Sequence, residues 1–422
     1  FSKVINPLLI GRLTMVTADI ISAFFIYKIG NELVNKRYGI FCSIIYLSLP
    51  LNFFHSRVIL LEPITNVFFL AGLYSYQKYF NNPKNKINKK NIIKIIILLV
   101  LSFLSKPIAI VSFSALFLFS ITSRLNEKRF SVLNFVSDLK TQLIIFFAVF
   151  LLASPFIFQV WNGFSDYRVG PNFFQMFANF KSNLWLTYWW LKVYLTMPIL
   201  FTILFSIFII FLKKDWKMIG IIFWLLSIIF FENLIGTNFL PRHLFLVSAP
   251  VSLLVGFLFL EIWKKSKKTI AIFSFFIILI IPLANNVKII NDPKNAPIAL
   301  EDKQQFFYDW TSGEGLNLLA NDLKNFTEDA VIFNEYDLGF GWSLKYIYKV
   351  NNITIIESRD LDVKNTRLNL SNIKLTQPQN IYIIFNKNSV PPISWPIDLV
   401  KSYDKVTGIR KIKLYRYLGN DT

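Results

Sequence analysis

The chain has 422 residues, of which 54% are hydrophobic and 17% aromatic, with a mean hydropathy of +0.48 and a formal net charge of +20. This composition excludes an ordinary soluble protein and predicts an integral membrane protein with the lipid bilayer as a partner. The charge does not indicate nucleic-acid binding, because residues 288–422 have a net charge of only +1 and the excess lies beside apolar segments, where it attracts anionic lipid headgroups.

Ten segments are apolar enough to lie in a bilayer: 8–28, 38–55, 60–80, 92–105, 107–122, 142–160, 194–212, 218–235, 243–261 and 269–287. The loops between them alternate in charge. One set carries 20 Lys and Arg residues (28–37, 78–94, 123–140, 213–217 and 264–268), and the opposite set carries seven (1–7, 54–63, 105–107, 161–193 and 236–243). Because cytoplasmic loops hold the excess of Lys and Arg, the second set is predicted to be extracytoplasmic in a multi-pass protein of the plasma membrane.

Residues 92–122 are about 30 mostly apolar residues, interrupted by Ser105-Lys106-Pro107. One helix of this length exceeds a bilayer core that needs about 20 residues. Proline lacks a backbone donor and disfavours helix in the residue before it. We therefore predict two short spans with Lys106 at the outer turn. Residues 1–7 then lie outside, and we expect at least one span upstream of Phe1.

After the last apolar segment, residues 288–300 contain Asp292-Pro293 and Ala296-Pro297 and are predicted to be a linker. Alternating apolar residues then predict short strands at 330–334, 353–357, 381–385 and 411–417, preceded by a helix at about 315–326. The predicted fold is therefore mainly α: a multi-span helical domain (1–287), and a small extracytoplasmic α/β domain (301–422).

The outer loop 161–193 is predicted to lie at the bilayer interface, where aromatic residues gather. It contains Trp161, Tyr167, Phe173, Phe174, Trp185, Tyr188, Trp189 and Trp190. In an enzyme that uses a lipid substrate, these side chains could also line a path for an acyl or prenyl chain.

Ionisable residues are few on the predicted outer side, which makes them candidates for chemistry. The turn after the second span contains His55, Arg57 and Glu62, and two interpretations stay open. Arg57 and Glu62 stabilise one another at the interface, or Glu62 faces a polar cleft beside a cation that holds a phosphate.

Lys106 is the second candidate, either as a lysine that reaches the interface or as a ligand for phosphate. Arg242 and His243 form the third, because arginine offers a fixed fork of donors that suits phosphate oxygens. The remaining ionisable residues of this side are Asp166, Arg168 and Glu232.

Arg12 and Asp19 stand seven residues apart in the first span, hence on one helical face, and are predicted to form a structural pair. With two histidines and one cysteine, the chain offers no metal-ligand spacing. It also has no Gly-rich phosphate-binding loop, so neither a nucleotide site nor a cofactor is predicted, and a divalent-metal requirement is left open.

Three groups of residues together resemble a known enzyme family. The first is Gly11-Arg12-Leu13 through Tyr27-Lys28-Ile29-Gly30, followed by Arg37-Tyr38-Gly39 and Leu49-Pro50. The second is His55-Ser56-Arg57-Val58-Ile59-Leu60-Leu61-Glu62-Pro63. The third comprises Leu104-Ser105-Lys106-Pro107 and Pro241-Arg242-His243. Their order and spacing over residues 8–287 resemble the polyprenyl-phosphate-sugar-dependent membrane glycosyltransferases of the GT-C fold, of the protein mannosyltransferase and lipid A aminoarabinose transferase type.

The resemblance implies an inverting transfer of a sugar from a polyprenyl-phosphate donor to a hydroxyl of an acceptor glycan, lipid or protein, outside the cytoplasm in the cell envelope. It implies that Lys106 and Arg242 hold the lipid phosphate, with Glu62 positioning sugar or acceptor, and that His243, Asp166, Arg168, His55 and Arg57 are further site residues. Glu62 departs from the family, which more commonly has Asp there. The family's main catalytic acid lies in an outer loop ahead of the segment that opens this chain, so a general base is not expected among these residues.

Three other functions fit part of the sequence. A transporter or flippase for a lipid-linked glycan would favour internal repeats and interrupted helices, and no clear repeat is visible. A non-catalytic assembly protein would explain the C-terminal domain but not the charged outer turns. An O-antigen ligase or oligosaccharyltransferase is also a multi-span enzyme that uses a lipid-linked donor, but it transfers whole glycans.

Overall fold

A computed structural model of the chain describes residues 7–80, 89–125, 132–163, 173–235, 240–308, 315–326, 330–335, 340–350, 353–358, 381–385, 391, 395–404 and 411–418. The chain divides into two compact units. One is Leu9–Ala299, and the other is Leu300–Thr422 together with Phe1–Leu8.

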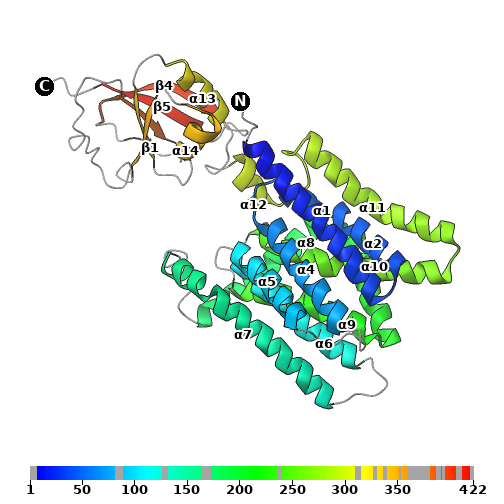
Figure 1. Cartoon of the computed structure of the whole chain (residues 1–422). Helices are drawn as coiled ribbons and strands as arrows, with labels where there is room; N and C mark the ends of the chain where they lie inside the picture. The colour runs from blue at the N-terminus through cyan, green and yellow to red at the C-terminus, as the bar shows by residue number, and fades with distance from the viewer. Residues whose placement is uncertain are drawn as a thin grey trace, which may run out of the picture. The chain divides into compact units, whose positions relative to one another are not determined.

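The first unit is a helical bundle (Figure 1). Its elements are α1 (Pro7–Leu33), α2 (Lys36–Ser48), α3 (Pro50–His55), α4 (Glu62–Phe80), α5 (Lys89–Ser105), the 3₁₀ helix η1 (Pro107–Phe113), α6 (Ser114–Leu125), α7 (Val132–Gly163), α8 (Phe173–Lys213), α9 (Trp216–Ile235), the 3₁₀ helix η2 (Pro241–Val247), α10 (Ser248–Lys265) and α11 (Lys268–Asn291).

Six helical stretches in the described part of the chain are long and apolar enough to cross a bilayer: Leu8–Leu33, Asp138–Phe156, Asn179–Lys213, Trp216–Leu234, Pro241–Lys265 and Lys268–Asn291. The chain is therefore an integral membrane protein. The other predicted spans are helical but shorter or less apolar, so a total of about ten spans stays a prediction. The predicted break in residues 92–122 is confirmed, because α5 ends at Ser105 and η1 begins at Pro107.

The segment 161–193, predicted as an outer loop between two spans, is mostly helical in its described part, and its place outside the bilayer stays a prediction. Helix α7 continues to Gly163, and α8 already begins at Phe173. The loop was predicted because aromatic and polar residues lower the hydropathy of this segment, although they are compatible with a helix. On α8, Trp185, Tyr188 and Trp189 form an exposed aromatic stripe, while Trp190 is buried.

Helix α10 is the centre of the bundle, since every residue from Ser248 to Phe257 is buried. It packs against α2 at very short range: a Cβ added to Gly256 would lie 2.4 Å from the Cys42 sulfur. Helices α1 and α2 approach one another equally closely, because a Cβ on Gly39 would lie 2.4 Å from the carbonyl oxygen of Tyr27. These two glycines permit backbone contacts that no larger residue would allow.

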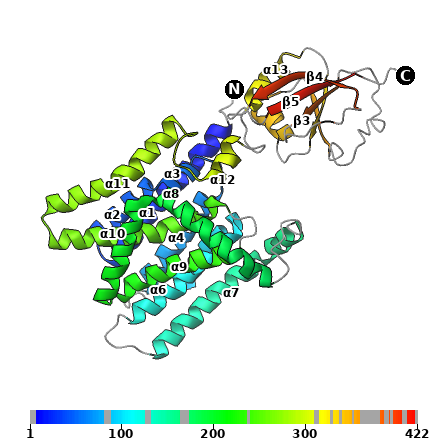
Figure 2. The same cartoon turned by 180° about the vertical axis from the view of Figure 1, so that it is seen from behind.

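Helices α7 and α11 lie along opposite edges of the bundle (Figures 1 and 2). Each presents large apolar side chains outward, such as Phe147 and Leu151 on α7 and Phe273 and Ile280 on α11. In a soluble protein such faces would mark a contact surface, whereas in a bilayer they face lipid.

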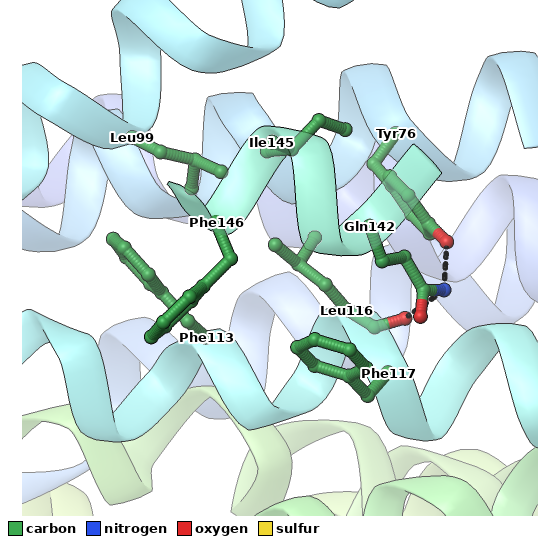
Figure 3. A pocket seen from close by; sticks show the side chains of 8 residues that line it. All are labelled: Tyr76, Leu99, Phe113, Leu116, Phe117, Gln142, Ile145 and Phe146. Carbon is green, nitrogen blue, oxygen red and sulfur yellow. Dashed lines mark hydrogen bonds between the residues drawn. The ribbon is translucent and has the colours of Figure 1, made fainter. Parts of the chain in front are cut away.

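A small pocket lies among α4, α5, α6 and α7 (Figure 3). Its lining is apolar except for Gln142, whose amide donates to the Tyr76 hydroxyl and, at 3.3 Å, to the Leu116 carbonyl. The volume is about 10 Å³, room for about one water molecule. A sugar or a lipid chain would not fit, so this pocket is a packing gap rather than a substrate site.

The second unit contains a five-stranded sheet of order β2-β1-β3-β5-β4. Its described elements are α12 (Leu300–Lys303), the π-helical turn η3 (Gln304–Tyr308), α13 (Leu316–Lys324), β1 (Val331–Glu335), α14 (Phe340–Trp342), the π-helical turn η4 (Ser343–Ile347), β2 (Thr354–Ser358), β3 (Ile381–Phe385), β4 (Ile397–Asp404) and β5 (Lys411–Tyr417).

The three strands β2, β1 and β3 are parallel, and β5 pairs antiparallel with β3 and β4. Alternate residues of β1 pack on opposite faces: Ile332 joins the core under α13, whereas Val331 and Phe333 join the core around Trp395. The predicted helix and four predicted strands are confirmed. Strand β4 was not predicted, because most of its side chains are exposed and its apolar residues do not alternate.

Helix α13 is tied to strand β4 through Asp322, which accepts hydrogen bonds from Lys401 Nζ at 2.6 Å and the Tyr403 hydroxyl at 2.8 Å. These donors lower the pKa of Asp322. A lowered folded-state pKa adds stability at neutral pH that is lost as the pH falls through that pKa. We expect Asp322→Asn to destabilise the α13–β4 contact by less than about 1 kcal/mol at pH 7, since the pair is partly exposed. The effect should disappear as the pH falls through the lowered pKa and the carboxyl becomes protonated.

Amide hydrogen exchange of α13 in the full chain, compared with wild type at each pH, measures this effect. Asp404→Asn is the matched control, because the Asp404–Lys411 pair at 2.8 Å is more exposed. Equal effects of both substitutions, or an Asp322→Asn effect that does not decrease as the pH is lowered, would contradict the prediction.

Candidate functional site

The site is built at the end of the bundle where α4 begins. Glu62 is the first residue of α4 and Pro63 the second. Proline suits the first turn of a helix, where its missing N–H has no partner to lose, and a carboxylate there is stabilised by the helix dipole. The Glu62 side chain is buried. The local sequence therefore places a carboxylate at a helix start, inside the protein.

Lys106 stands at the break between α5 and η1. Its backbone is extended (φ −160°, ψ 117°), as expected for a residue before proline. The hydroxyl of Ser102, one turn earlier, donates to the carbonyl oxygen of Thr65 at 2.9 Å and fastens the end of α5 to the start of α4. This contact brings Lys106 beside Glu62.

Arg242 and His243 are presented by a second turn of the same kind. Leu240 is extended (φ −133°, ψ 151°), and Pro241 starts the 3₁₀ helix η2, which continues into α10. The neighbouring Leu244, Phe245, Leu246 and Val247 are all buried, so the turn is held by packing. Two proline-initiated 3₁₀ turns thus each place a basic residue at the same end of the bundle.

The three predicted residues Glu62, Lys106 and Arg242 meet in space. Lys106 Nζ forms an ion pair with Glu62 Oε1, and Arg242 Nε lies 3.9 Å from the same oxygen. The carboxylate is buried, whereas the Lys106 and Arg242 side chains are 23% and 25% exposed. A ligand that approaches would therefore meet the cations, with the carboxylate behind them holding them in place.

A second carboxyl group, Glu232 near the end of α9, joins this cluster. It interacts electrostatically with Lys106 and Glu62 and is completely buried. From the sequence it was only one of the ionisable residues of the outer side, without a role. A glutamate within an otherwise apolar helix was the signal that could have singled it out.

The two histidines lie beside the cluster. His243 interacts electrostatically with Lys106, Arg242 and His55. His55 is buried, donates from Nδ1 to the Leu51 carbonyl at 2.8 Å, and has its ring centroid 5.5 Å from that of Tyr194. The structure therefore brings both predicted histidines to the site.

Tyr194 reaches His55 because α8 is interrupted directly after it. Thr196 has φ 68° and ψ 155°, a strained conformation for a β-branched residue, and Pro198 follows within the same helix. This break turns the chain at the level of α3, where Tyr194 also packs on Phe54 with centroids 6.4 Å apart.

The structure does not place Arg57 against Glu62, as one of the two interpretations of the sequence had it. No ion pair joins it to Glu62, although both residues are described; its guanidinium carbon lies 3.5 Å from the centroid of the Phe53 ring. The proposed Arg57–Glu62 pair was therefore wrong, because the nearer Lys106 occupies the carboxylate. Asp166 and Arg168 lie outside the described residues.

The predicted Arg12–Asp19 pair was also wrong. Asp19 is buried and accepts a hydrogen bond from the Tyr46 hydroxyl at 2.7 Å, whereas Arg12 is exposed. Seven residues share a helical face but are about 10 Å apart along the axis, too far for a direct pair. Asn66 donates to the Tyr46 hydroxyl at 2.9 Å, so this network joins α1, α2 and α4.

No protein-family model and no curated protein matches the chain. Solved structures of the oligosaccharyltransferase of Archaeoglobus fulgidus are similar. The apo form has a TM-score of 0.43 at 11% identity, covering 89% of this chain and 58% of that one. The form tethered to an acceptor peptide containing the NVT sequon has a TM-score of 0.44 at 14% identity, covering 89% and 57%. The chain thus spans less than two thirds of that protein's length, and the proposed function rests on the residues of the site.

Proposed function

We propose that the chain is a membrane glycosyltransferase of the GT-C type that moves a sugar from a polyprenyl-phosphate carrier to an acceptor hydroxyl on the extracytoplasmic face. The observation that supports this most is the convergence of Lys106 and Arg242 on the buried Glu62, at one end of an apolar helical bundle. Two partly exposed cations at such a place suit a phosphate attached to a lipid chain.

The proposed reaction is an inverting displacement. The acceptor oxygen attacks the anomeric carbon of the sugar, and the bond between that carbon and the phosphate oxygen breaks. The leaving lipid phosphate takes up the negative charge, which Lys106 and Arg242 would stabilise where it develops. The proton of the acceptor hydroxyl needs a base, and by the family resemblance that base is none of the residues of this site.

Glu62 would contribute by holding the two cations in position. A lysine and an arginine close together repel one another, and the carboxylate between them offsets this repulsion. When a phosphate enters, each cation can turn from Glu62 to the ligand without leaving the site. Glu62 is therefore proposed as a positioning residue that can also contact the sugar or acceptor.

The test uses the complete protein, with any residues that precede Phe1 included, in proteoliposomes. Polyprenyl-phosphate-linked mannose, glucose and aminoarabinose are the donors, and a membrane extract is the acceptor source. We expect the protein to release polyprenyl phosphate from at least one of these donors. When nucleotide sugars are offered instead, we expect no release of free nucleotide. Turnover of nucleotide sugars, or passage of the intact donor to the other leaflet without release of its sugar, would contradict the proposal. The second outcome would favour a flippase.

A further inference from the structure

The side chain of Glu232 has no exposed surface and no hydrogen-bond partner at either carboxyl oxygen among the described residues. Burying a polar group without a hydrogen bond is unfavourable, and burying a charged one is more so. Native proteins satisfy nearly all such groups, so an exception needs a reason. A ligand that supplies the missing donors is one such reason.

The neighbouring residue shows that the end of α9 is not poorly packed. Asn233 is equally buried, yet its side chain accepts from Thr187 at 2.9 Å and donates to the Ile229 carbonyl at 2.6 Å. Its backbone carbonyl accepts from Asn183 at 3.0 Å. Consecutive positions thus differ: the side chain of Asn233 is hydrogen-bonded to the protein, and that of Glu232, which interacts electrostatically with Lys106, is not.

We infer that Glu232 is a ligand-binding residue whose carboxyl group accepts hydrogen bonds from hydroxyl groups of the donor's sugar. This inference rests on the proposed function and adds the group that recognises the sugar. If Lys106 and Arg242 take the phosphate, the sugar is the next part of the donor, and Glu232 interacts electrostatically with Lys106.

Stability measurements test the inference without any substrate. In the absence of ligand, replacement of an unbonded buried carboxyl by an apolar side chain of similar size removes an unfavourable group. We expect Glu232→Met to raise the thermal unfolding temperature of the full chain in lipid nanodiscs by about 2–4 °C. Asn233→Leu, the matched control, should lower it, because the buried Thr187 hydroxyl loses the side-chain oxygen that accepts its hydrogen bond. A loss of stability in Glu232→Met comparable to that in Asn233→Leu would show that Glu232 is structural and would overturn the inference.

Kinetics with the lipid-phosphate sugars supply the second arm. We expect Glu232→Met to raise KM about 10- to 100-fold, and Glu232→Gln, which keeps two polar atoms, to recover most of this loss. Wild type should discriminate against a donor that lacks a sugar hydroxyl, and Glu232→Met should not. If the wild type turns over and Glu232→Met has an unchanged KM, the inference about Glu232 is overturned and the proposed function stands. Absence of wild-type turnover would overturn the proposed function, and the stability arm would still decide whether Glu232 is a binding or a structural group.

Discussion

Glu62→Ala is expected to reduce release of polyprenyl phosphate by at least about 100-fold, because it frees two cations that the carboxylate holds in one position. It should also destabilise the chain. Removal of one partner from a fully buried ion pair costs about 3–5 kcal/mol. The Lys106 and Arg242 side chains keep 23% and 25% of their surface exposed, so we expect a smaller loss of about 2 kcal/mol.

Glu62→Gln separates the two effects. The amide fills the same space but carries no charge, so it should keep more of the stability than alanine while losing most of the activity. Thermal unfolding and initial rates, measured on the same samples, give both quantities. Wild-type rates in Glu62→Ala would remove Glu62 from the site altogether. Wild-type rates in Glu62→Gln alone would mean that the shape of the residue matters and its charge does not.

Arg242→Ala is expected to lower kcat by about 10²- to 10³-fold, the effect of removing one preorganised donor from a developing anion. Arg242→Lys should recover only part of this rate, because an ammonium group is a point charge and lacks the planar fork of the guanidinium. Rates with saturating donor measure the effect on kcat, and their dependence on donor concentration separates it from KM.

Lys213→Ala is the matched control for Arg242→Ala. Lys213 also pairs with a buried glutamate, Glu261, but at the other end of α10. Loss of that pair should change stability without changing kcat. Equal losses of kcat in the two variants would show that the effect of Arg242 arises from the bundle as a whole and not from the ligand.

Most of the secondary structure could be predicted because it depends on local sequence. Pro107 ends α5 whatever the helix packs against. The alternating residues of β1, β3 and β5 indicate strands without any knowledge of their neighbours. The errors have local causes as well. The aromatic start of α8 has too little aliphatic character to be recognised as a helix from its hydropathy, and β4 is an edge strand with mostly exposed side chains.

The site could be predicted as a set of residues but not as a geometry. Lys106 was a candidate from its position before Pro107, yet its partner Glu62 is 44 residues away, and only the packing of α5 on α4 brings them together. For the same reason a pair between Glu62 and the nearby Arg57 stayed one of the two interpretations of the sequence. Charge within an apolar helix could have singled out Glu232, but its lack of hydrogen bonds is visible only once its neighbours are in place.

The close contact between α2 and α10 has a practical consequence for deciding which side of the membrane the site faces. Cys42, the only cysteine of the chain, has no exposed surface and lies under Gly256. A thiol sealed in this way should not react with water-soluble maleimides while the chain is folded. Single cysteines introduced at Lys267, between α10 and α11, and at Ile59, between α3 and α4, can therefore be labelled in intact cells with the native residue left in place.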